Sequence, residues 1–508
     1  MDISIKGLYK NAAEFLAGPV GSIVIHVVVL LAAGLLLATT MNKKKETEIE
    51  VQVVEIEEKQ LDQELEDLKP PEDLPDMVDT VTPPDVDIDM DIPQEPQDFS
   101  AAPVMDTMTE LNIASDAMSP IVLKGLQSGQ TSQRSGDGRA ASIGAYGGAW
   151  GAAAEAAVLR ALRWFKNNQG GDGGWSWVDG KKEQGKRAAI TSLGILAFLA
   201  HGETPASEEY GETVTRAIRY VLACQDADGY FYSAREKGSD AAAYEQAICV
   251  YALSEAYGMT RIPSLKGAMD KGTAIIVKGI QRPNGGYDYQ WKQEGRTDIS
   301  LGAWCVQAMK AAWMAGCTVP ELHDVMELEL KSMKTHQVES GHFKYSNAKS
   351  SPAYANMTAA AVLSMQLLGH ADDRAVKDGL KAMADEKCVW AHPQNWAMYG
   401  WYYIAQAKFH EGGASWSKWN NMFAPQFVQN QMKGDDPKID GAWRSPGATT
   451  KDNIDGGAKE DWGEDYAYTT ALATLTLTVY YRFLPTYKPV EIKTVDQTSD
   501  TDVEIEIF

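Results

Sequence analysis

Residues 166–177 read KNNQGGDGGWSW, a glutamine followed by a glycine-rich turn and an aromatic cluster. The pattern returns as Gln225-Asp-Ala-Asp-Gly-Tyr-Phe231, Gln281-Arg-Pro-Asn-Gly-Gly-Tyr287 and Gln337-Val-Glu-Ser-Gly-His-Phe343. Each of these glutamines follows the previous one by 56 residues. Two weaker copies come later, at Glu386-Lys-Cys-Val-Trp390 and at Gln431…Asp440-Gly-Ala-Trp443. A fixed period of this length indicates a repeat architecture.

Each repeat contains two helical patterns. The pattern before the glutamine is amphipathic, as in Ala152–Asn168, and predicts an outer helix. The pattern after the aromatic is apolar nearly all round and predicts a buried inner helix. The six inner stretches are 188–200, 244–253, 299–309, 356–368, 398–407 and 466–477. We therefore predict an all-α domain of six helical hairpins, with twelve helices, over residues 149–487.

The turn between the two helices has three expected roles. Glycine is expected to end the outer helix in a left-handed cap, because only glycine adopts that conformation cheaply. The aromatic is expected to pack against the neighbouring hairpin, and the glutamine amide to bond helix-end backbone groups. Six such hairpins can close into a ring or run open as a solenoid, and the period alone leaves both open.

The order Gln…Gly-x-Trp/Phe/Tyr after an outer helix resembles the QW repeat of squalene–hopene cyclases. The same α/α toroid occurs in protein prenyltransferase β subunits and in the thioester domains of complement-like proteins. The resemblance covers about 340 residues and implies a closed (α/α)6 barrel. The DxDD acid of the cyclases and the Cys-Gly-Glu-Gln loop of the thioester domains do not occur in this sequence.

The zinc site of the prenyltransferases can also be compared with this chain. Asp298-Ile-Ser300 resembles the Asp-x-Cys ligands of that family, with serine in place of cysteine. Asp465-Tyr-Ala-Tyr468 resembles the stretch with the histidine ligand, with tyrosine in its place. One carboxylate is too few for tetrahedral zinc, so we predict no metal and no cofactor.

Polar residues recur at the expected amino ends of the inner helices, where they would share one rim of the barrel. They are Glu245, Asp298, Ser300, Tyr354, Asn356, Tyr399, Asp465 and Tyr468. One interpretation makes them N-caps and first-turn groups favoured by the helix dipole. The other makes them a pocket, with Asp298, Asp465 and Glu245 as acid/base candidates and the rest as binding residues.

The N-terminal segment, residues 1–45, is predicted to anchor the chain in a membrane. Phe15 to Asn42 contains no charged residue, and Gly21–Thr40 is long enough to span a bilayer as one helix. Ser22-Ile-Val-Ile-His26, with the Val/Glu-rich and Pro/acid-rich stretches that follow, resembles the N-terminus of TonB-type energy transducers. That resemblance implies that Ser22 and His26 face a proton-driven channel complex in the inner membrane, with the rest of the chain in the periplasm. The lysines at 43–45 favour the opposite orientation.

Residues 46–148 are predicted to be a disordered linker. Residues 46–100 hold 20 acidic side chains, two lysines and seven of the chain's prolines, a composition that keeps a chain extended. The linker could reach on the order of 300 Å, enough to cross a periplasm. Residues 488–508 form an acidic tail, read either as an added edge strand or as disordered. A net charge of −23 argues against nucleic-acid binding.

Two functions follow from these observations. The first is a membrane-tethered periplasmic binding or scaffold protein coupled to a proton channel of the TonB type. The second is an enzyme acting on an isoprenoid or a glycan inside the barrel. A deep aromatic pocket with a buried carboxylate would favour the enzyme, whereas a barrel filled by side chains would favour the scaffold.

Overall fold

The computed structural model describes residues 134–175, 186–232, 242–394, 396–447 and 466–482. All of them belong to one compact unit, Asp73–Phe508. The predicted anchor with Ser22 and His26, most of the linker, Asp465 and the tail lie outside the described residues. Within the described residues, no helix combines the length and apolar character that crossing a membrane requires.

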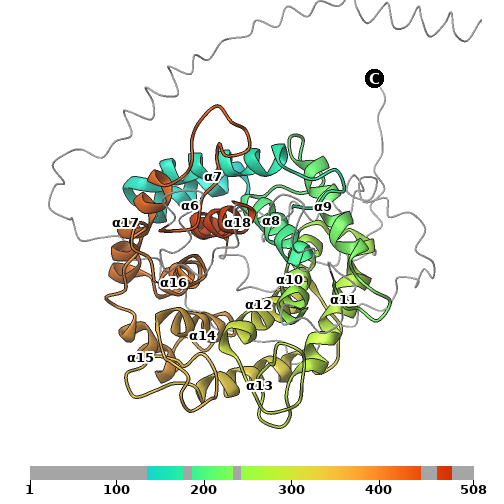
Figure 1. The fold of residues 1–508 in the computed structure, drawn as a ribbon, viewed down its shortest axis with the longest axis vertical. Helices are drawn as coiled ribbons and strands as arrows, with labels where there is room; N and C mark the ends of the chain where they lie inside the picture. Colours follow the sequence, from blue (N-terminus) through green and yellow to red (C-terminus); the bar gives the residue numbers. More distant parts are fainter. Residues whose placement is uncertain (1–133, 176–185, 233–241, 395, 448–465, 483–508) are drawn as a thin grey trace, which may run out of the picture. The chain divides into compact units, whose positions relative to one another are not determined.

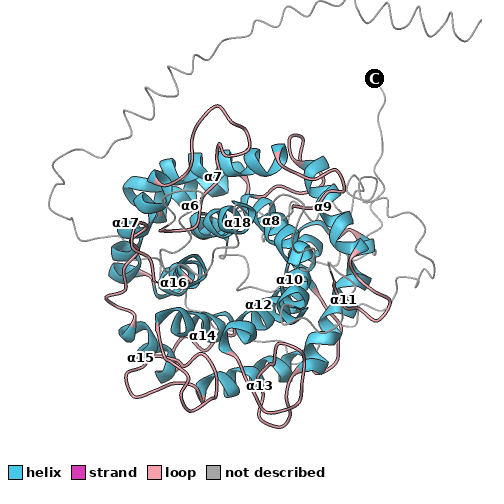
Figure 2. Cartoon of the chain, in the orientation of Figure 1, coloured by secondary structure: helices cyan, strands magenta, loops and turns pink. Residues whose placement is uncertain are grey.

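Twelve helices of the described residues alternate between an outer and an inner layer, as the repeat predicted (Figure 1). The outer helices are α7 (Gly151–Asn167), α9 (Gly211–Ala223), α11 (Pro263–Gly279), α13 (Leu322–Lys334), α15 (Arg374–Ala382) and α17 (Gly413–Gln429). The inner helices are α8 (Arg187–His201), α10 (Ala242–Thr260), α12 (Ile299–Ala315), α14 (Ala355–Leu367), α16 (Ala397–Glu411) and α18 (Tyr466–Leu477). The described part contains no strand (Figure 2).

The hairpins close into a ring. Each inner helix contacts the next one along the chain, and the last, α18, packs against the first, α8, as well as against α7. The inner helices are buried on all sides; every residue of α14, for example, is buried. The all-round apolar patterns of the sequence therefore belong to helices enclosed between the outer layer and the ring centre, and the closed alternative is the correct one.

Four of the repeat glutamines make the same pair of hydrogen bonds. Gln169 Nε2 donates to Gly173 O in its own turn and to Thr213 O in the next outer helix, at 2.8 Å each. Gln225 and Gln337 repeat this arrangement one and three hairpins later. Gln431 Nε2 donates to Gly441 O and to Ala157 O of α7, again at 2.8 Å. The acceptors in the next outer helix lie in its first turn in two cases, Thr213 and Ala375, as expected for helix-end groups, and further along it in the other two. Gln431 fastens the last hairpin to the first.

We call this pair of hydrogen bonds the glutamine clamp, and the contact between the last hairpin and the first the closing seam. Because Gln431 makes the clamp there, we expect the closing seam to be as stable as the contacts between the other neighbouring hairpins. We expect Gln431→Ala to lower the free energy of unfolding by roughly 1–2 kcal/mol, because the variant loses both bonds and the one that Gln431 Oε1 accepts from Arg160. Gln169→Ala is expected to cost about the same. Urea unfolding followed by near-UV circular dichroism measures both. A stable Gln431→Ala beside a destabilised Gln169→Ala would mean that the clamp does not hold the seam.

The turn glycine does not cap the outer helix, contrary to the prediction. Helix α7 ends at Asn168, whose φ of −111° is not left-handed, and the left-handed residue is Gly173, at φ +94°. A Cβ at Gly173 would lie 2.4 Å from Arg216 O of α9. Glycine is needed because the turn presses on the backbone of the next outer helix. The same approach occurs at Gly229, Gly285, Gly341 and Gly441.

The repeat aromatic packs inside its own hairpin, and in two repeats it also lies against the neighbouring one as expected. A Cβ at Gly272 of α11 would lie 3.0 Å from Phe231, and one at Gly379 of α15 would lie 3.5 Å from Phe343. Trp175 contacts Phe165 of α7 and Phe198 of α8, with ring centroids 5.2 and 6.1 Å apart. Its backbone N–H donates to Thr191 Oγ1 at 3.1 Å and its indole N–H to Phe165 O at 2.8 Å. The aromatic thus joins the two helices of one hairpin, while the glutamine and glycine join one hairpin to the next.

Part of the stretch predicted as a disordered linker is helical. Helix α6 (Gly136–Tyr146) packs on α7 and on the terminal helix α19 (Val479–Arg482), and η2 (Gly148–Trp150) follows it. Arg139 Nη1 donates to His201 O at 2.7 Å, and Arg134 Nη1 to Leu199 O at 3.2 Å. These arginines satisfy carbonyls at the carboxyl end of α8. The Gly/Ser-rich composition concealed this helix.

Side chains fill the ring centre at the level of Trp304. Trp304 of α12 stacks on Tyr402 of α16, with centroids 5.5 Å apart, although α14 separates these helices along the ring. Arg482 of α19 donates to Tyr251 Oη at 2.8 Å and lies over the Tyr402 ring. Trp304, Tyr402 and Arg482 are 3% exposed or less. Helix α19 therefore inserts an arginine into the carboxyl end of the barrel.

Candidate functional site

The most distinctive polar group at the amino ends of the inner helices is centred on Asp298. Asp298 is the N-cap of α12, and its Oδ1 accepts from the backbone N–H of Ser300 at 3.0 Å and of Leu301 at 3.2 Å. The Ser300 hydroxyl donates to the same oxygen at 2.5 Å. Arg296 Nη2 lies 3.2 Å from Oδ2. The capping interpretation is thus correct for Asp298, but its carboxylate also belongs to a larger group of hydrogen-bonded polar side chains.

Tyrosines from α10, from α16 and from the loop before α12 lie near this carboxylate. Tyr244 Oη of α10 lies 2.5 Å from Ser300 Oγ and 3.4 Å from Tyr289 Oη. Tyr399 of α16 donates to Ser300 O at 3.2 Å. Because the ionised carboxylate only accepts, Ser300 donates to it and Tyr244 donates to Ser300. A chain of hydroxyls therefore leads from Asp298 towards partly exposed phenols.

The Asp298 carboxylate is fully buried, whereas several tyrosines near it are partly exposed. The Asp298 side chain is 0% exposed, and its partner Arg296 is 43% exposed. The Arg296 guanidinium lies 4.5 Å from the Tyr289 ring centroid. Five partly exposed tyrosines lie in the region of this carboxylate: Tyr244, Tyr289, Tyr345, Tyr354 and Tyr468. We call Asp298, Ser300, Arg296 and these five tyrosines the rim cluster.

Burial governs the titration of the rim cluster. Burial raises the pKa of Asp298 to about 6, although hydrogen bonds from Ser300 and Leu301 and the charge of Arg296 act against it. Burial, together with the nearby Tyr345 and Asp298, raises the pKa of Tyr354 to about 12. The pKa values of Tyr244 and Tyr399 are likewise raised well above the usual range, chiefly by burial. At neutral pH the cluster presents an ionised carboxylate beneath neutral phenols.

Two predicted site residues act on neighbouring helices. Glu245 Oε1 accepts from the backbone N–H of Ala188 at 3.1 Å and of Ala189 at 3.4 Å, at the amino end of α8. Asn356 Nδ2 donates to Trp396 O, at the start of α16, at 3.2 Å. Only the Glu245 contact is that of a capping group, because it accepts from first-turn N–H groups of the adjacent inner helix, whereas Trp396 O already accepts from Gly400 N at 2.9 Å.

Of the two remaining predicted site residues, the structure describes Tyr468 but not Asp465. Tyr468 lies in the first turn of α18, near enough to Tyr399 to help raise the pKa of that phenol. Asp465 lies outside the described residues. Tyr244 and Tyr289 were missed by the sequence analysis. A signal existed for Tyr244, which directly precedes Glu245, whereas Tyr289 lies in a loop and had none.

Asp298 and Ser300, the pair compared with the prenyltransferase ligands, lie side by side at the start of α12. The two side chains lie 2.5 Å apart, so the Asp-x-Ser spacing does place both groups at one point. Within the described residues, no three His, Cys, Asp or Glu side chains gather as a metal site would require. The chemistry that the described residues offer is hydrogen bonding and proton exchange.

A scan against protein-family models and a search of curated proteins found no match for the sequence. Similar solved structures include an inactive α-1,6-mannanase variant of Salegentibacter in complex with α-1,6-mannotriose, at 11% identity over 66% of this chain and 99% of that chain, with a TM-score of 0.45. A type II terpene cyclase from Scytonema with its substrate matches at 11% identity over 65% of this chain and 98% of that chain, with a TM-score of 0.45. A cellobiose 2-epimerase from Bacillus thermoamylovorans matches at 14% identity over 63% of this chain and 96% of that chain, with a TM-score of 0.47. Likenesses at these values assign none of these activities to the ring.

Proposed function

We propose that the ring is a binding module that takes a hydroxyl-rich ligand, a glycan, on the rim cluster. The observation that carries this proposal is a buried, ionised carboxylate beneath five partly exposed tyrosines. Aromatic faces stack on sugar rings, the exposed Arg296 guanidinium offers donors to hydroxyls, and the phenols both donate and accept.

The packed ring centre supports binding at the rim over reaction in a deep chamber. Below Ser300, Gln307 Nε2 donates to Tyr403 Oη at 2.8 Å, and Tyr402 Oη donates to Gln307 Oε1 at 2.9 Å. These bonds cross from α12 to α16, and all three side chains are 2% exposed or less. We further propose that the N-terminal segment displays the ring in the periplasm, on a TonB-type anchor with Ser22 and His26 and a long acidic tether.

One observation favours a second function, catalysis on a glycan or an isoprenoid. Asp298, with a pKa raised to about 6, is suited to exchange protons near neutral pH. The Ser300 and Tyr244 hydroxyls link it to the partly exposed surface. In this function Asp298 would be the acid/base and the tyrosines would hold the substrate.

Titration of the full-length protein with neutral oligosaccharides (α- and β-glucans, mannans and N-acetylglucosamine oligomers), with analysis of products, separates the two functions. We expect binding without turnover. Tyr289→Ala should weaken binding by roughly three- to tenfold, the value of one aromatic contact. The matched control is Tyr257→Ala, a partly exposed tyrosine near the carboxyl end of α10.

Three outcomes would count against the binding module. If no oligosaccharide binds, the glycan proposal is wrong. If Tyr257→Ala weakens binding as much as Tyr289→Ala does, the rim cluster is not the site. Products that disappear in Asp298→Asn, while binding persists, would assign the ring to the enzyme function.

A further inference from the structure

The third repeat departs from the clamp used by the others. In the four regular repeats, the glutamine amide bonds a carbonyl three residues before the one that the turn glycine approaches. By this register, Gln281 would bond Gly285 O and Val325 O of α13. Instead, Gln281 Nε2 donates to Arg296 O at 2.5 Å, and its Oε1 accepts from Gly295 N at 2.6 Å. The amide has turned from α13 to the 288–297 loop.

The third repeat differs from the others at a second position as well. In the regular repeats, a hydroxyl or amide of the inner helix accepts from the backbone N–H of the aromatic, as Thr358 does for Phe343 at 3.0 Å. The equivalent position in the third repeat is Gly302. A Cβ there would lie 2.1 Å from Glu329 Oε1, and Glu329 Oε2 accepts from Gly286 N at 2.8 Å. A buried carboxyl from the outer helix thus fills the space of the usual inner-helix group, and it accepts from the backbone N–H one residue before the aromatic.

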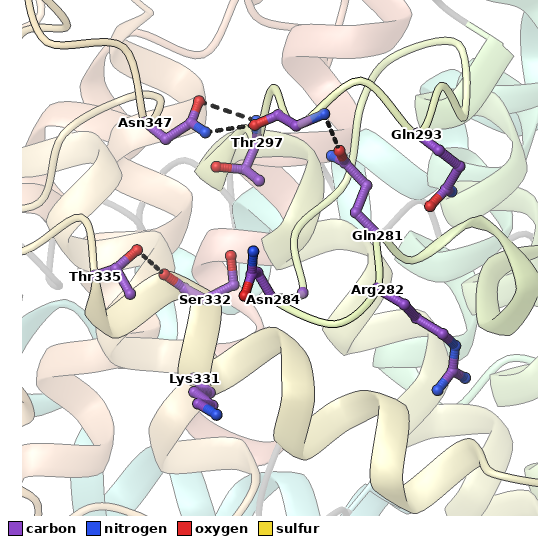
Figure 3. A pocket seen from close by; sticks show the side chains of 11 residues that line it. Gln281, Arg282, Asn284, Gln293, Thr297, Lys331, Ser332, Thr335 and Asn347 are labelled. Atoms are coloured by element: carbon purple, nitrogen blue, oxygen red, sulfur yellow. Dashed lines mark hydrogen bonds between the residues drawn. The ribbon is translucent and has the colours of Figure 1, made fainter.

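A cavity of about 400 Å³ opens beside the diverted glutamine (Figure 3). Its walls are the turn of the third repeat, the 293–297 loop, Asn347, and Lys331, Ser332 and Thr335 at the carboxyl end of α13. Figure 3 shows Gln281 turned to the loop side, with Ser332 and Asn284 facing one another below it. The side chains are amides, hydroxyls and two cations: Gln281, Asn284, Gln293, Asn347, Thr297, Ser332, Thr335, Arg282 and Lys331.

The charge of this cavity differs from that of the chain. The protein has 70 acidic and 47 basic residues, yet the lining contains Arg282 and Lys331 and no carboxylate. Arg282 pairs with Glu321 outside the lining, at 2.5 Å. Among the described residues, no hydrogen bond or ion pair engages the Lys331 ammonium. Glu329, behind the turn, has a pKa raised to about 8 by burial, so it is largely uncharged at neutral pH.

We propose that this cavity binds a small hydroxyl-rich molecule that carries a carboxylate or a phosphate, such as a sugar acid or a sugar phosphate. Lys331 and Arg282 pair with the oxyanion, and the Asn284, Gln293 and Asn347 amides with the hydroxyls, since an amide both donates and accepts. The volume suits one monosaccharide unit. This site is separate from the rim cluster, and its test does not depend on the proposed function.

Isothermal titration of the full-length protein with four probes tests this proposal: glucuronate, glucose 1-phosphate, glucose and inorganic phosphate. We expect one or both of the first two to bind, and glucose and phosphate to bind at least about tenfold more weakly. The stronger of the two tells whether the physiological oxyanion is a carboxylate or a phosphate. Lys331→Gln should weaken binding about tenfold, the value of one charge-assisted hydrogen bond. Lys278→Gln is the matched control, an exposed lysine of α11 that carries the same charge.

The proposal fails if neither glucuronate nor glucose 1-phosphate binds. It also fails if Lys278→Gln and Lys331→Gln weaken binding equally, because the effect would then reflect net charge alone. Phosphate binding as tightly as glucose 1-phosphate would overturn the role given to the amides. Because Lys331 is exposed, its replacement leaves the fold intact, which a wild-type circular dichroism spectrum of the variant would verify.

Discussion

Gly173→Ala is expected to destabilise the ring by roughly 2–5 kcal/mol. Gly173 has φ +94°, a conformation that costs a residue with a Cβ about 1–2 kcal/mol. The new Cβ would also lie 2.4 Å from Arg216 O, a backbone atom that moves only if α9 moves. Overpacking of this kind adds typically 1–3 kcal/mol. Urea unfolding of the full-length protein, followed by near-UV circular dichroism, measures the sum.

The same turn provides the control. Gly171 lies two residues earlier, and a Cβ there would meet nothing within 4 Å. We expect Gly171→Ala to change the free energy of unfolding by less than about 1 kcal/mol. Equal effects of the two substitutions would show that the turn needs flexibility and not contact with the next hairpin. The joint that we describe between neighbouring hairpins would then be wrong.

The repeat period was sufficient to predict the fold because the residues that recur are those that hold the helices of the ring together. Gln169, Gly173 and Trp175 each make a contact that the architecture requires, so the three recur together. The sequence predicted their recurrence and the two helical layers correctly. It placed the glycine contact wrongly, because a motif shows which residues are required and not which helix they meet.

The candidate site was only partly predictable for a related reason. Asp298 and Ser300 were found because they begin an inner helix. Tyr289 and Arg296 belong to a loop, and nothing local indicates that this loop folds over α10 and α12. Helix α6 was missed because its stability comes from Arg139 and His201 across the fold and not from its own Gly- and Ser-rich sequence.

The pH dependence of stability is expected to change in Glu329→Gln. Glu329 is buried and its pKa is raised from 4.5 to about 8, so the folded protein holds a proton that the unfolded chain releases at lower pH. The stabilisation is complete below pH 4.5 and is lost as the pH rises towards 8. Between pH 6 and pH 8 this loss amounts to about 2 kcal/mol. Glutamine keeps the acceptor for Gly286 N–H and carries no charge at either pH.

We therefore expect the stability of Glu329→Gln, measured relative to the wild type, to rise by about 2 kcal/mol from pH 6 to pH 8. Urea unfolding at the two pH values gives the difference between the proteins, which removes the contribution of other groups, among them His201, whose pKa is also raised by its contacts with Glu155 and Glu203. Glu339→Gln replaces an exposed carboxylate and should show no such pH dependence. If Glu329→Gln falls in stability from pH 6 to pH 8 as steeply as the wild type, then Glu329 is already ionised at pH 6. In that case the third repeat holds a buried charge beside its cavity, which would repel the oxyanion that we place there.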